Sequence, residues 1–355
     1  MRWSIKRKYG NFFKGRLPNG CKLCMEGAKL VLFVTGVCDR NCPYCPLSEM
    51  RRGKDCVWAN ERPVKSPEDL VKEAELMGAL GAGITGGEPA IVKERVINFM
   101  EILKREFGDE FHIHMYTSKR LDRDTIEELY SKGLDELRFH STVESDFMLD
   151  SISISKEIGL CSGSEVPSMP DRVSDLISLA KSLKEINADF LNLNELEVTE
   201  TNYRALKDLG YSIGDISVQG SKEAALKVIK SVDFNIHFCS ASFKDGVQLR
   251  KRFIRTSLRI AREYEYVNED GLIVIGVIEH PEKEKLLEIM KEISHRYNLV
   301  EGKEIYLNLE RGRIETSPEV MEILVEEYQR EGVRYYLVEE YPIYGRPRAE
   351  VIPLG

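Results

Sequence analysis

The chain has 355 residues, of which 42% are hydrophobic and 31% charged, and its net charge is −8. No apolar run approaches the roughly 20 residues that cross a bilayer, and the basic N-terminus lacks the apolar segment of a secretory signal. We therefore expect a cytoplasmic protein without a membrane partner, whose eight cysteines serve metal binding or catalysis rather than disulfides. Its scarce glutamine and abundant Lys and Glu are typical of a thermophile.

The first 27 residues form a predicted basic N-terminal extension. Residues 1–25 carry seven Lys or Arg and no acid, with Trp3, Tyr9, Phe12 and Phe13 interleaved. Basic residues between aromatic ones are typical of nucleic-acid binding, which makes RNA a candidate partner despite the negative total charge.

Residues 28–240 alternate between short apolar runs and longer amphipathic ones. Strands are predicted at 30–35, 82–85, 111–117, 134–139, 159–166 and 189–193, with helices between them. Such alternation implies parallel strands with right-handed crossovers. The expected fold is therefore α/β, a partial (β/α)6 TIM-like barrel, in which chemistry sits at the carboxyl ends of the strands.

The rest of the chain is predicted to be a basic helical connector, residues 241–268, and a small C-terminal α/β domain, residues 269–355. In the connector, Arg252, Arg255, Arg259 and Arg262 recur at three- and four-residue steps and form one cationic stripe. The stripe is either a solvated helix face or a surface that recognises RNA or another anion. The C-terminal domain reads as strand, helix, strand, helix, strand at 272–278, 283–297, 305–309, 318–331 and 333–338.

The strongest chemical signal is a C-x₃-C-x₂-C array, Cys38, Cys42 and Cys45, directly after the first strand. Three neighbouring thiolates can hold three irons of a cubane cluster and leave the fourth iron open. An open metal position is where a reactant binds. Zinc is the alternative, but zinc prefers four ligands in paired motifs.

With the aromatic Tyr44 before its third cysteine, this array resembles the signature of the radical S-adenosylmethionine (SAM) superfamily. The resemblance implies a [4Fe–4S] cluster on Cys38, Cys42 and Cys45, whose open iron chelates SAM. It also implies an electron donor such as ferredoxin or flavodoxin. Reductive cleavage of SAM then yields a 5′-deoxyadenosyl radical that abstracts hydrogen from a substrate.

A second motif, Gly86-Gly87-Glu88-Pro89, follows the second strand and resembles the superfamily's turn that binds the SAM amino group. Two glycines permit close backbone approach, and the Glu88 carboxylate and exposed carbonyls suit an ammonium group. Further candidate cofactor-binding residues lie at the ends of the next four strands: Thr117, Ser118, His140, Glu165, Asn192 and Asn194. His140 and the two asparagines could instead contact substrate.

Several short segments of the sequence resemble those of an archaeal group related to pyruvate formate-lyase activating enzymes, although the cysteine-rich ferredoxin insert of many such activases is absent. Modified RNA, a peptide or protein residue, and a small metabolite remain open as substrates. The alternative outside catalysis is an iron–sulfur or zinc protein used for electron transfer or structure.

Four further residues form two pairs that could hold a second metal site, either zinc or an auxiliary cluster: Cys21 and Cys24, and His237 and Cys239. Residues two apart on a strand share a face, which permits joint ligation by His237 and Cys239 without requiring it. Cys56 and Cys161 are predicted to be packing residues.

Overall fold

The computed structural model describes residues 4–141 and 148–354. Two compact units divide the chain, one formed by Met1–Glu75 and Ala79–Leu249 and the other by Leu76–Gly78 and Arg250–Gly355. This single division near residue 250 differs from the boundaries at 28, 241 and 269 that the sequence suggested. Trp3 lies outside the described residues.

The first unit is built on one sheet whose central strands are parallel, in the order β11-β10-β9-β8-β7-β6-β3. These strands are β3 (Lys29–Phe33), β6 (Gly81–Thr85), β7 (His112–Thr117), β8 (Glu136–Phe139), β9 (Cys161–Pro167), β10 (Phe190–Asn194) and β11 (Ile236–Cys239). The partial TIM-like barrel is thereby confirmed. β11 extends the six expected β/α units by a seventh parallel strand, which pairs with β10.

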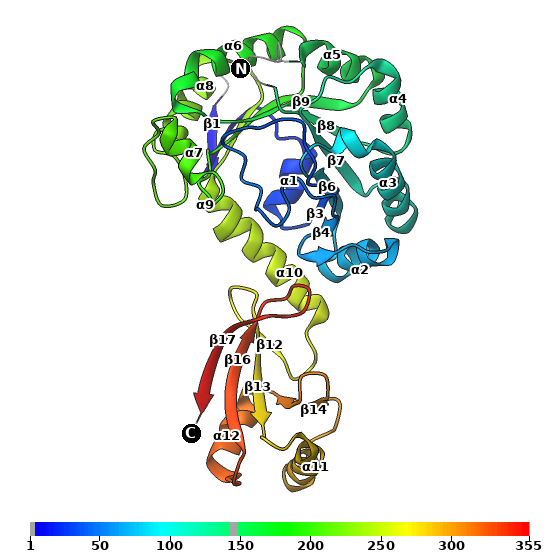
Figure 1. The fold of residues 1–355 in the computed structure, drawn as a ribbon, viewed down its shortest axis with the longest axis vertical. Coiled ribbons are helices and arrows are strands. Elements are labelled where there is room, and N and C mark those ends of the chain that lie inside the picture. Colours follow the sequence, from blue (N-terminus) through cyan, green and yellow to red (C-terminus); the bar gives the residue numbers. More distant parts are fainter. Residues whose placement is uncertain (1–3, 142–147, 355) are drawn as a thin grey trace. The chain divides into compact units, whose positions relative to one another are not determined.

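Helices follow the parallel strands and line the outer side of the curved sheet (Figure 1). They are α2 (Pro67–Met77), α3 (Lys93–Phe107), α4 (Arg123–Ser131), α5 (Leu149–Ile158), α6 (Val173–Glu185), α7 (Tyr203–Asp208) and α8 (Ser221–Ser231). Their apolar residues recur at helical spacing; α3, for example, buries Val96, Met100 and Leu103. The N-cap of α4 is Asp122, whose carboxylate accepts from the Thr125 N–H.

The N-terminal segment belongs to the barrel rather than to a separate extension. β1 (Ile5–Lys8) and β2 (Asn11–Lys14) form a hairpin, and β2 continues the sheet antiparallel to β11. α1 (Asn19–Met25) then lies inside the curve of the sheet (Figure 1). At the other edge, β4 (Trp58–Ala59) pairs with β3 and with β5 (Arg62–Pro63).

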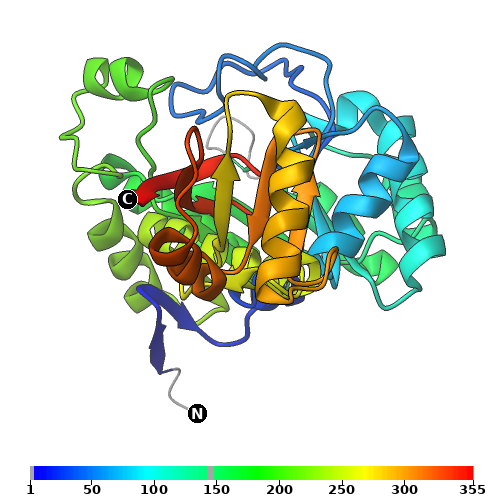
Figure 2. The ribbon, with the colours of Figure 1, turned by 90° about the horizontal axis from the view of Figure 1, so that it is seen from below.

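The second unit holds α10 (Arg250–Ile260) and an antiparallel sheet in the order β14-β15-β13-β16-β17. Its strands are β12 (Tyr266–Val267), β13 (Ile273–Glu279), β14 (Ile305–Asn308), β15 (Arg313–Thr316), β16 (Arg334–Glu340) and β17 (Arg348–Leu354). α11 (Leu286–Tyr297) and α12 (Pro318–Glu327) cover the same face of the sheet (Figure 2). The small α/β domain was expected, but β12, β15 and β17 were missed.

The second unit buries both an apolar core and a network of charges. Ile289, Ile293 and Leu324 of the two helices pack on the sheet. Arg313, whose side chain is 1% exposed, donates to Glu315 at 2.8 Å and to Glu340 at 2.6 Å. Within the described residues, every helix is too short or too polar to cross a membrane.

Candidate active site

The first candidate site starts in the loop between β3 and β4, which carries the C-x₃-C-x₂-C array. This loop closes on itself at Gly36, whose N–H donates to the Lys54 carbonyl at 2.8 Å and whose carbonyl accepts from the Gly53 N–H at 2.8 Å. A Cβ atom at position 36 would lie 1.7 Å from the Arg51 carbonyl oxygen, so the crossing admits only glycine. The loop is therefore held at its base, beside the end of β3.

All three cysteines of the array line one cavity of about 630 Å³, which we call the cluster-side cavity. Cys38 is exposed, Cys42 and Cys45 are partly buried, and the Cys45 N–H donates to the Cys42 carbonyl at 3.1 Å. The described part of the chain contains no group of three His, Cys, Asp or Glu side chains placed to hold one metal ion. A cubane cluster makes a different demand, because each thiolate binds its own iron. Three thiols around one cavity fit that demand better than they fit zinc.

The Gly86–Pro89 turn lines the same cavity, after β6. Its backbone is pinned to the cysteine loop, because the Gly87 N–H donates to the Thr35 carbonyl at 2.7 Å and the Glu88 N–H to the Val37 carbonyl at 2.8 Å. A Cβ atom on Gly86 would lie 2.4 Å from the Thr35 oxygen, and one on Gly87 2.3 Å from the Val37 oxygen. The two glycines therefore allow two loops to touch backbone to backbone.

The Glu88 carboxylate is buried and committed to the protein. One oxygen accepts from the Thr117 hydroxyl at 2.7 Å and the Ala90 N–H at 3.0 Å, and the other from the Ser118 N–H at 2.7 Å and hydroxyl at 2.6 Å. The carboxylate thus ties the turn after β6 to the end of β7. The sequence suggested it as a direct partner for an ammonium group; its geometry is that of a positioning residue.

Tyr44 and His140 form a second brace at this cavity. The Tyr44 hydroxyl lies 2.8 Å from His140 Nε2, and His140 Nδ1 lies 3.2 Å from the Glu165 carbonyl. Since a carbonyl only accepts, Nδ1 carries the proton and Nε2 accepts from Tyr44. Burial lowers the pKa of His140, in keeping with a neutral ring. The pair fixes the cysteine loop against β8.

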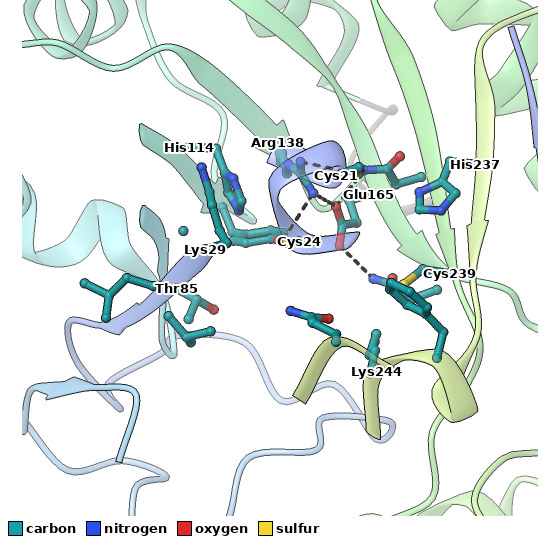
Figure 3. A pocket seen from close by; sticks show the side chains of 18 residues that line it. Cys21, Cys24, Lys29, Thr85, His114, Arg138, Glu165, His237, Cys239 and Lys244 are labelled. Carbon is teal, nitrogen blue, oxygen red and sulfur yellow. Dashed lines mark hydrogen bonds and ion pairs between the residues drawn. The ribbon is translucent and has the colours of Figure 1, made fainter. Parts of the chain in front are cut away.

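A second cavity of about 260 Å³ lies inside the barrel, and we call it the barrel pocket (Figure 3). Thr85, Tyr116 and Asn194 line both this pocket and the cluster-side cavity. Of the predicted cofactor-binding residues, Gly86, Gly87, Glu88, Pro89, Thr117, Ser118 and His140 line the cluster-side cavity. Glu165 and Asn192 line the barrel pocket and not the cluster-side cavity. The predicted cofactor-binding residues are therefore divided between the two cavities.

Glu165 organises the wall of the barrel pocket. Its carboxylate accepts from Arg138 at 2.6 Å, from the Asn192 amide at 2.9 Å and from the Asn194 amide at 2.9 Å. Burial alone would raise the pKa of Glu165, but Arg138 and the two amides hold the pKa below its usual value. Arg138 is itself buried and also pairs with Glu136.

The four residues of the predicted second metal site, Cys21, Cys24, His237 and Cys239, all line the barrel pocket. Figure 3 shows the first pair on α1 and the second pair on β11. The Cys21 sulfur already accepts from the Asn192 amide at 3.3 Å and from Arg138 at 3.6 Å. Burial raises the pKa of Cys239 to about 12. Joint ligation stays a prediction, because the described residues contain no group placed to hold an ion.

Part of the basic and aromatic set that suggested RNA is engaged within the fold, although Lys6, Arg7 and Lys8 are exposed. In the N-terminal segment, Phe12 is buried against Phe238 and Tyr9 stacks on Phe243. In the arginine stripe, Arg252 is buried and Arg255 donates to the Gly78 carbonyl at 2.9 and 2.6 Å. These contacts explain the residues by packing and give no support to an RNA surface.

Sequence reasoning missed several pocket residues: Lys29, His114, Tyr116, Arg138 and Lys244. A signal was present in the strands, because side chains at alternate positions of a barrel strand face the interior. Polar residues occupy such positions at 112, 114 and 116 and again at 136 and 138. The alternation of polar residues along these two strands therefore predicts a polar barrel interior.

Family models match two parts of the chain. Residues 32–146 match the radical SAM superfamily, and residues 271–354 match a domain of unknown function (DUF8061). The first match contains both the cysteine array and the Gly86–Pro89 turn.

Among curated proteins, the chain is 36% identical to a Methanocaldococcus jannaschii protein described as "Putative glycyl-radical enzyme activating enzyme", over 96% of this chain and 93% of that protein. It is 27% identical to biotin synthase of Bacillus subtilis over 47% of this chain and 53% of that protein. Among solved structures, Streptococcus suis SuiB bound to SAM gives a TM-score of 0.44 at 16% identity, over 62% of this chain and 53% of SuiB.

Proposed function

The chain belongs to the radical SAM superfamily, and we propose that Cys38, Cys42 and Cys45 hold the [4Fe–4S] cluster at which it cleaves SAM. Membership in the superfamily makes the protein an enzyme that generates a radical from SAM. The observation that carries the residue assignment is the shared cavity: three thiols from the loop after β3 and the glycine turn after β6 line the same space.

A cluster held by these cysteines would supply one electron, received from a ferredoxin, a flavodoxin or dithionite, for cleavage of the C5′–S bond of SAM into methionine and a 5′-deoxyadenosyl radical, which would take a hydrogen atom from a substrate C–H bond. The protein's own part is to bind, orient and shield the reactants.

In this proposal the backbone of the glycine turn binds SAM, and the side chains around it hold the two loops in place. The backbone carbonyls of the Gly86–Gly87 turn receive the SAM ammonium group, since carbonyl oxygens accept from a cation. Glu88 holds that turn through Thr117 and Ser118. Tyr44 and His140 hold the cysteine loop in place.

The test compares two cysteines of one loop. Anaerobically reconstituted, dithionite-reduced protein should convert SAM to 5′-deoxyadenosine. Cys42→Ala should lose both the cluster and this turnover, whereas Cys56→Ala, outside the array but in the same loop, should keep both. Full turnover in Cys42→Ala would show that the cluster is held elsewhere.

The predicted auxiliary metal at Cys21, Cys24, His237 and Cys239 has support from their common pocket. Iron, zinc and sulfide analysis of the wild type against a Cys21→Ala/Cys24→Ala double variant measures it directly. A second site requires metal beyond one cluster that the double variant loses.

A further inference from the structure

The loop that carries the cysteine array, residues 34–57, turns back on itself beside Cys38. The Gly53 N–H donates to the Gly36 carbonyl at 2.8 Å, and Gly36 is two residues before Cys38. Two residues span at most about 7 Å of extended chain. Of the three cysteines in the array, Cys38 is the exposed one. Residues 48–54, which we call the basic turn, therefore stand beside the most accessible thiol of the array.

The basic turn carries two cations without an ion pair. Arg52 and Lys54 are exposed, and neither has an ion-pair partner within the described part of the chain. The third cation of the turn, Arg51, is partly buried and interacts electrostatically with Glu61. Glu49 is the one acid in the sequence of the turn. The turn therefore presents more positive than negative charge to solvent.

The acids on either side of the basic turn are neutralised by other side chains. Lys119 pairs with Asp39 at 2.9 Å, and Arg95 donates to both oxygens of Asp55 at 2.5 and 2.9 Å. Arg40 donates to a backbone carbonyl at 2.7 Å, a neutral acceptor that leaves the positive charge of Arg40 unbalanced. Because the whole chain carries a net charge of −8, this loop is a positive region on a negative protein.

An exposed apolar side chain lies in the middle of the basic turn. Met50 is 72% exposed. Methionine adapts to partner surfaces of different shapes because its side chain is unbranched and flexible. Redox proteins meet through small contact areas, typically under about 1,200 Å², and charges at the edge of such contacts steer the encounter. The basic turn offers both components, an adaptable apolar residue and unpaired charges next to it.

We propose that the basic turn docks the electron donor of the enzyme, and that this donor is a small, acidic iron–sulfur protein of the ferredoxin type. Arg52 and Lys54 contact its carboxylates, and Met50 contacts its surface beside its own cluster. In one encounter the donor is oxidised by one electron and the enzyme is reduced by one electron. The acidic charge follows from complementarity to the turn, and the iron–sulfur centre from the strongly negative potentials that such clusters reach. The inference rests on the proposed function, since the electron is delivered for the cleavage of SAM.

The test separates delivery of the electron from the chemistry that follows it. Formation of 5′-deoxyadenosine by the reconstituted full-length enzyme is measured with dithionite, a small reductant that needs no docking surface, and this rate tests the proposed function by itself. It is then measured with a reduced bacterial-type two-cluster ferredoxin and, separately, with a reduced flavodoxin. The ferredoxin-supported rate should fall as the salt concentration rises from about 0.01 to 1 M, because the Debye length shortens from about 30 to 3 Å.

Two variants of the basic turn test its contacts. Lys54→Glu should lower the rate at low salt and sub-saturating ferredoxin about fivefold, because reversing a charge at the edge of a contact slows association. Met50→Ser should lower that rate about twofold and leave its salt dependence unchanged, since it removes apolar contact and no charge. Neither side chain lines the cluster-side cavity, whereas Arg52 does. Both variants should therefore keep the dithionite-supported rate of the wild type.

The matched control is Lys230→Glu, which changes the net charge by the same amount as Lys54→Glu. Lys230 is exposed in the last turn of α8, which leads to the amino end of β11. That end of the barrel strands is opposite to the end that carries the cysteine loop. Lys230→Glu should respond to ferredoxin, to dithionite and to salt as the wild type does.

Equal ferredoxin-supported rates in Lys54→Glu and Lys230→Glu would overturn the proposal. So would a parallel loss of the ferredoxin- and dithionite-supported rates in Lys54→Glu, which would give the turn a role inside the active site. Turnover that flavodoxin supports and ferredoxin does not would show that the donor is wrongly identified. A wild type that forms no 5′-deoxyadenosine with dithionite would instead refute the proposed function.

Discussion

The sharpest consequence of the cavity geometry concerns Glu88, because two roles for its carboxylate predict opposite results. As a direct partner of the SAM ammonium group, Glu88 should matter by its charge alone. As a brace, it should matter through Thr117 and Ser118, which donate to it at 2.6–2.7 Å. The structure favours the brace, since four hydrogen bonds already occupy the carboxylate.

Glu88→Gln places an amide NH₂ where one carboxylate oxygen stood. Hydroxyl groups can rotate to accept from it, but the N–H of Ala90 or Ser118 cannot and is left without an acceptor. A buried donor without a partner costs about 1–3 kcal/mol, or a roughly 5- to 150-fold loss of SAM affinity if the turn bears all of it. Thr117→Val removes one donor to the same carboxylate and should weaken SAM binding about fivefold, or ~1 kcal/mol.

The assay is anaerobic equilibrium binding of SAM to the reconstituted wild type, both single variants and the double variant, with iron content matched. If Glu88 is a brace, the double variant should bind nearly as well as the weaker single variant, because both changes damage one interaction. Wild-type affinity in Thr117→Val combined with complete loss in Glu88→Gln would refute the brace and restore the direct contact.

Two further predictions concern stability. Burial lowers the pKa of Lys29 from its ordinary 10.5 to about 7, so above pH 7 the unfolded chain binds more protons than the folded one and the free energy of unfolding rises with pH. Relative to Lys29→Met, urea unfolding of the wild type should show a gain of roughly 2 kcal/mol between pH 7 and 8.5. Parallel pH profiles for the two proteins would exclude this titration. Arg313→Met removes the fully buried cation that Glu315 and Glu340 share, while Arg311 and Arg346 still pair with Glu340. It should therefore destabilise the protein by about 1.5–3 kcal/mol, the worth of a hydrogen bond to a charged group. Arg348→Met, which breaks a half-exposed pair, should cost under about 1 kcal/mol in calorimetry; equal losses would contradict the reasoning.

Much of the barrel was readable because its strands and helices carry strong periodic patterns. Residues 82–85 and 111–117, for instance, were expected as strands and became β6 and β7 with shifts of one residue at their starts. β15 was missed for a physical reason. β15 reads Arg-Ile-Glu-Thr, and its charges are buried only because other side chains neutralise them. Such pairing depends on tertiary contacts that no local pattern contains.

In the candidate site, too, only the features that depend on local sequence could be predicted. The cysteine array and the Gly86–Pro89 turn were found by spacing, which is local, and both line one cavity. The role of Glu88 was not local, since it depends on donors 29 and 30 residues away. The N-terminal segment was read as a separate extension because its composition is basic. In the structure, β2 pairs with β11 and α1 lies inside the barrel. Both contacts involve partners more than 100 residues away in the sequence.

The interior of the barrel is polar where such barrels are usually apolar. Barrel interiors are usually filled by branched apolar side chains, yet Glu136, Arg138, Glu165 and Asn192 are buried here. Burying such groups is rarely the most stable choice, because well-packed apolar residues of similar volume do as well or better. Polar residues at these positions therefore sacrifice stability for something else.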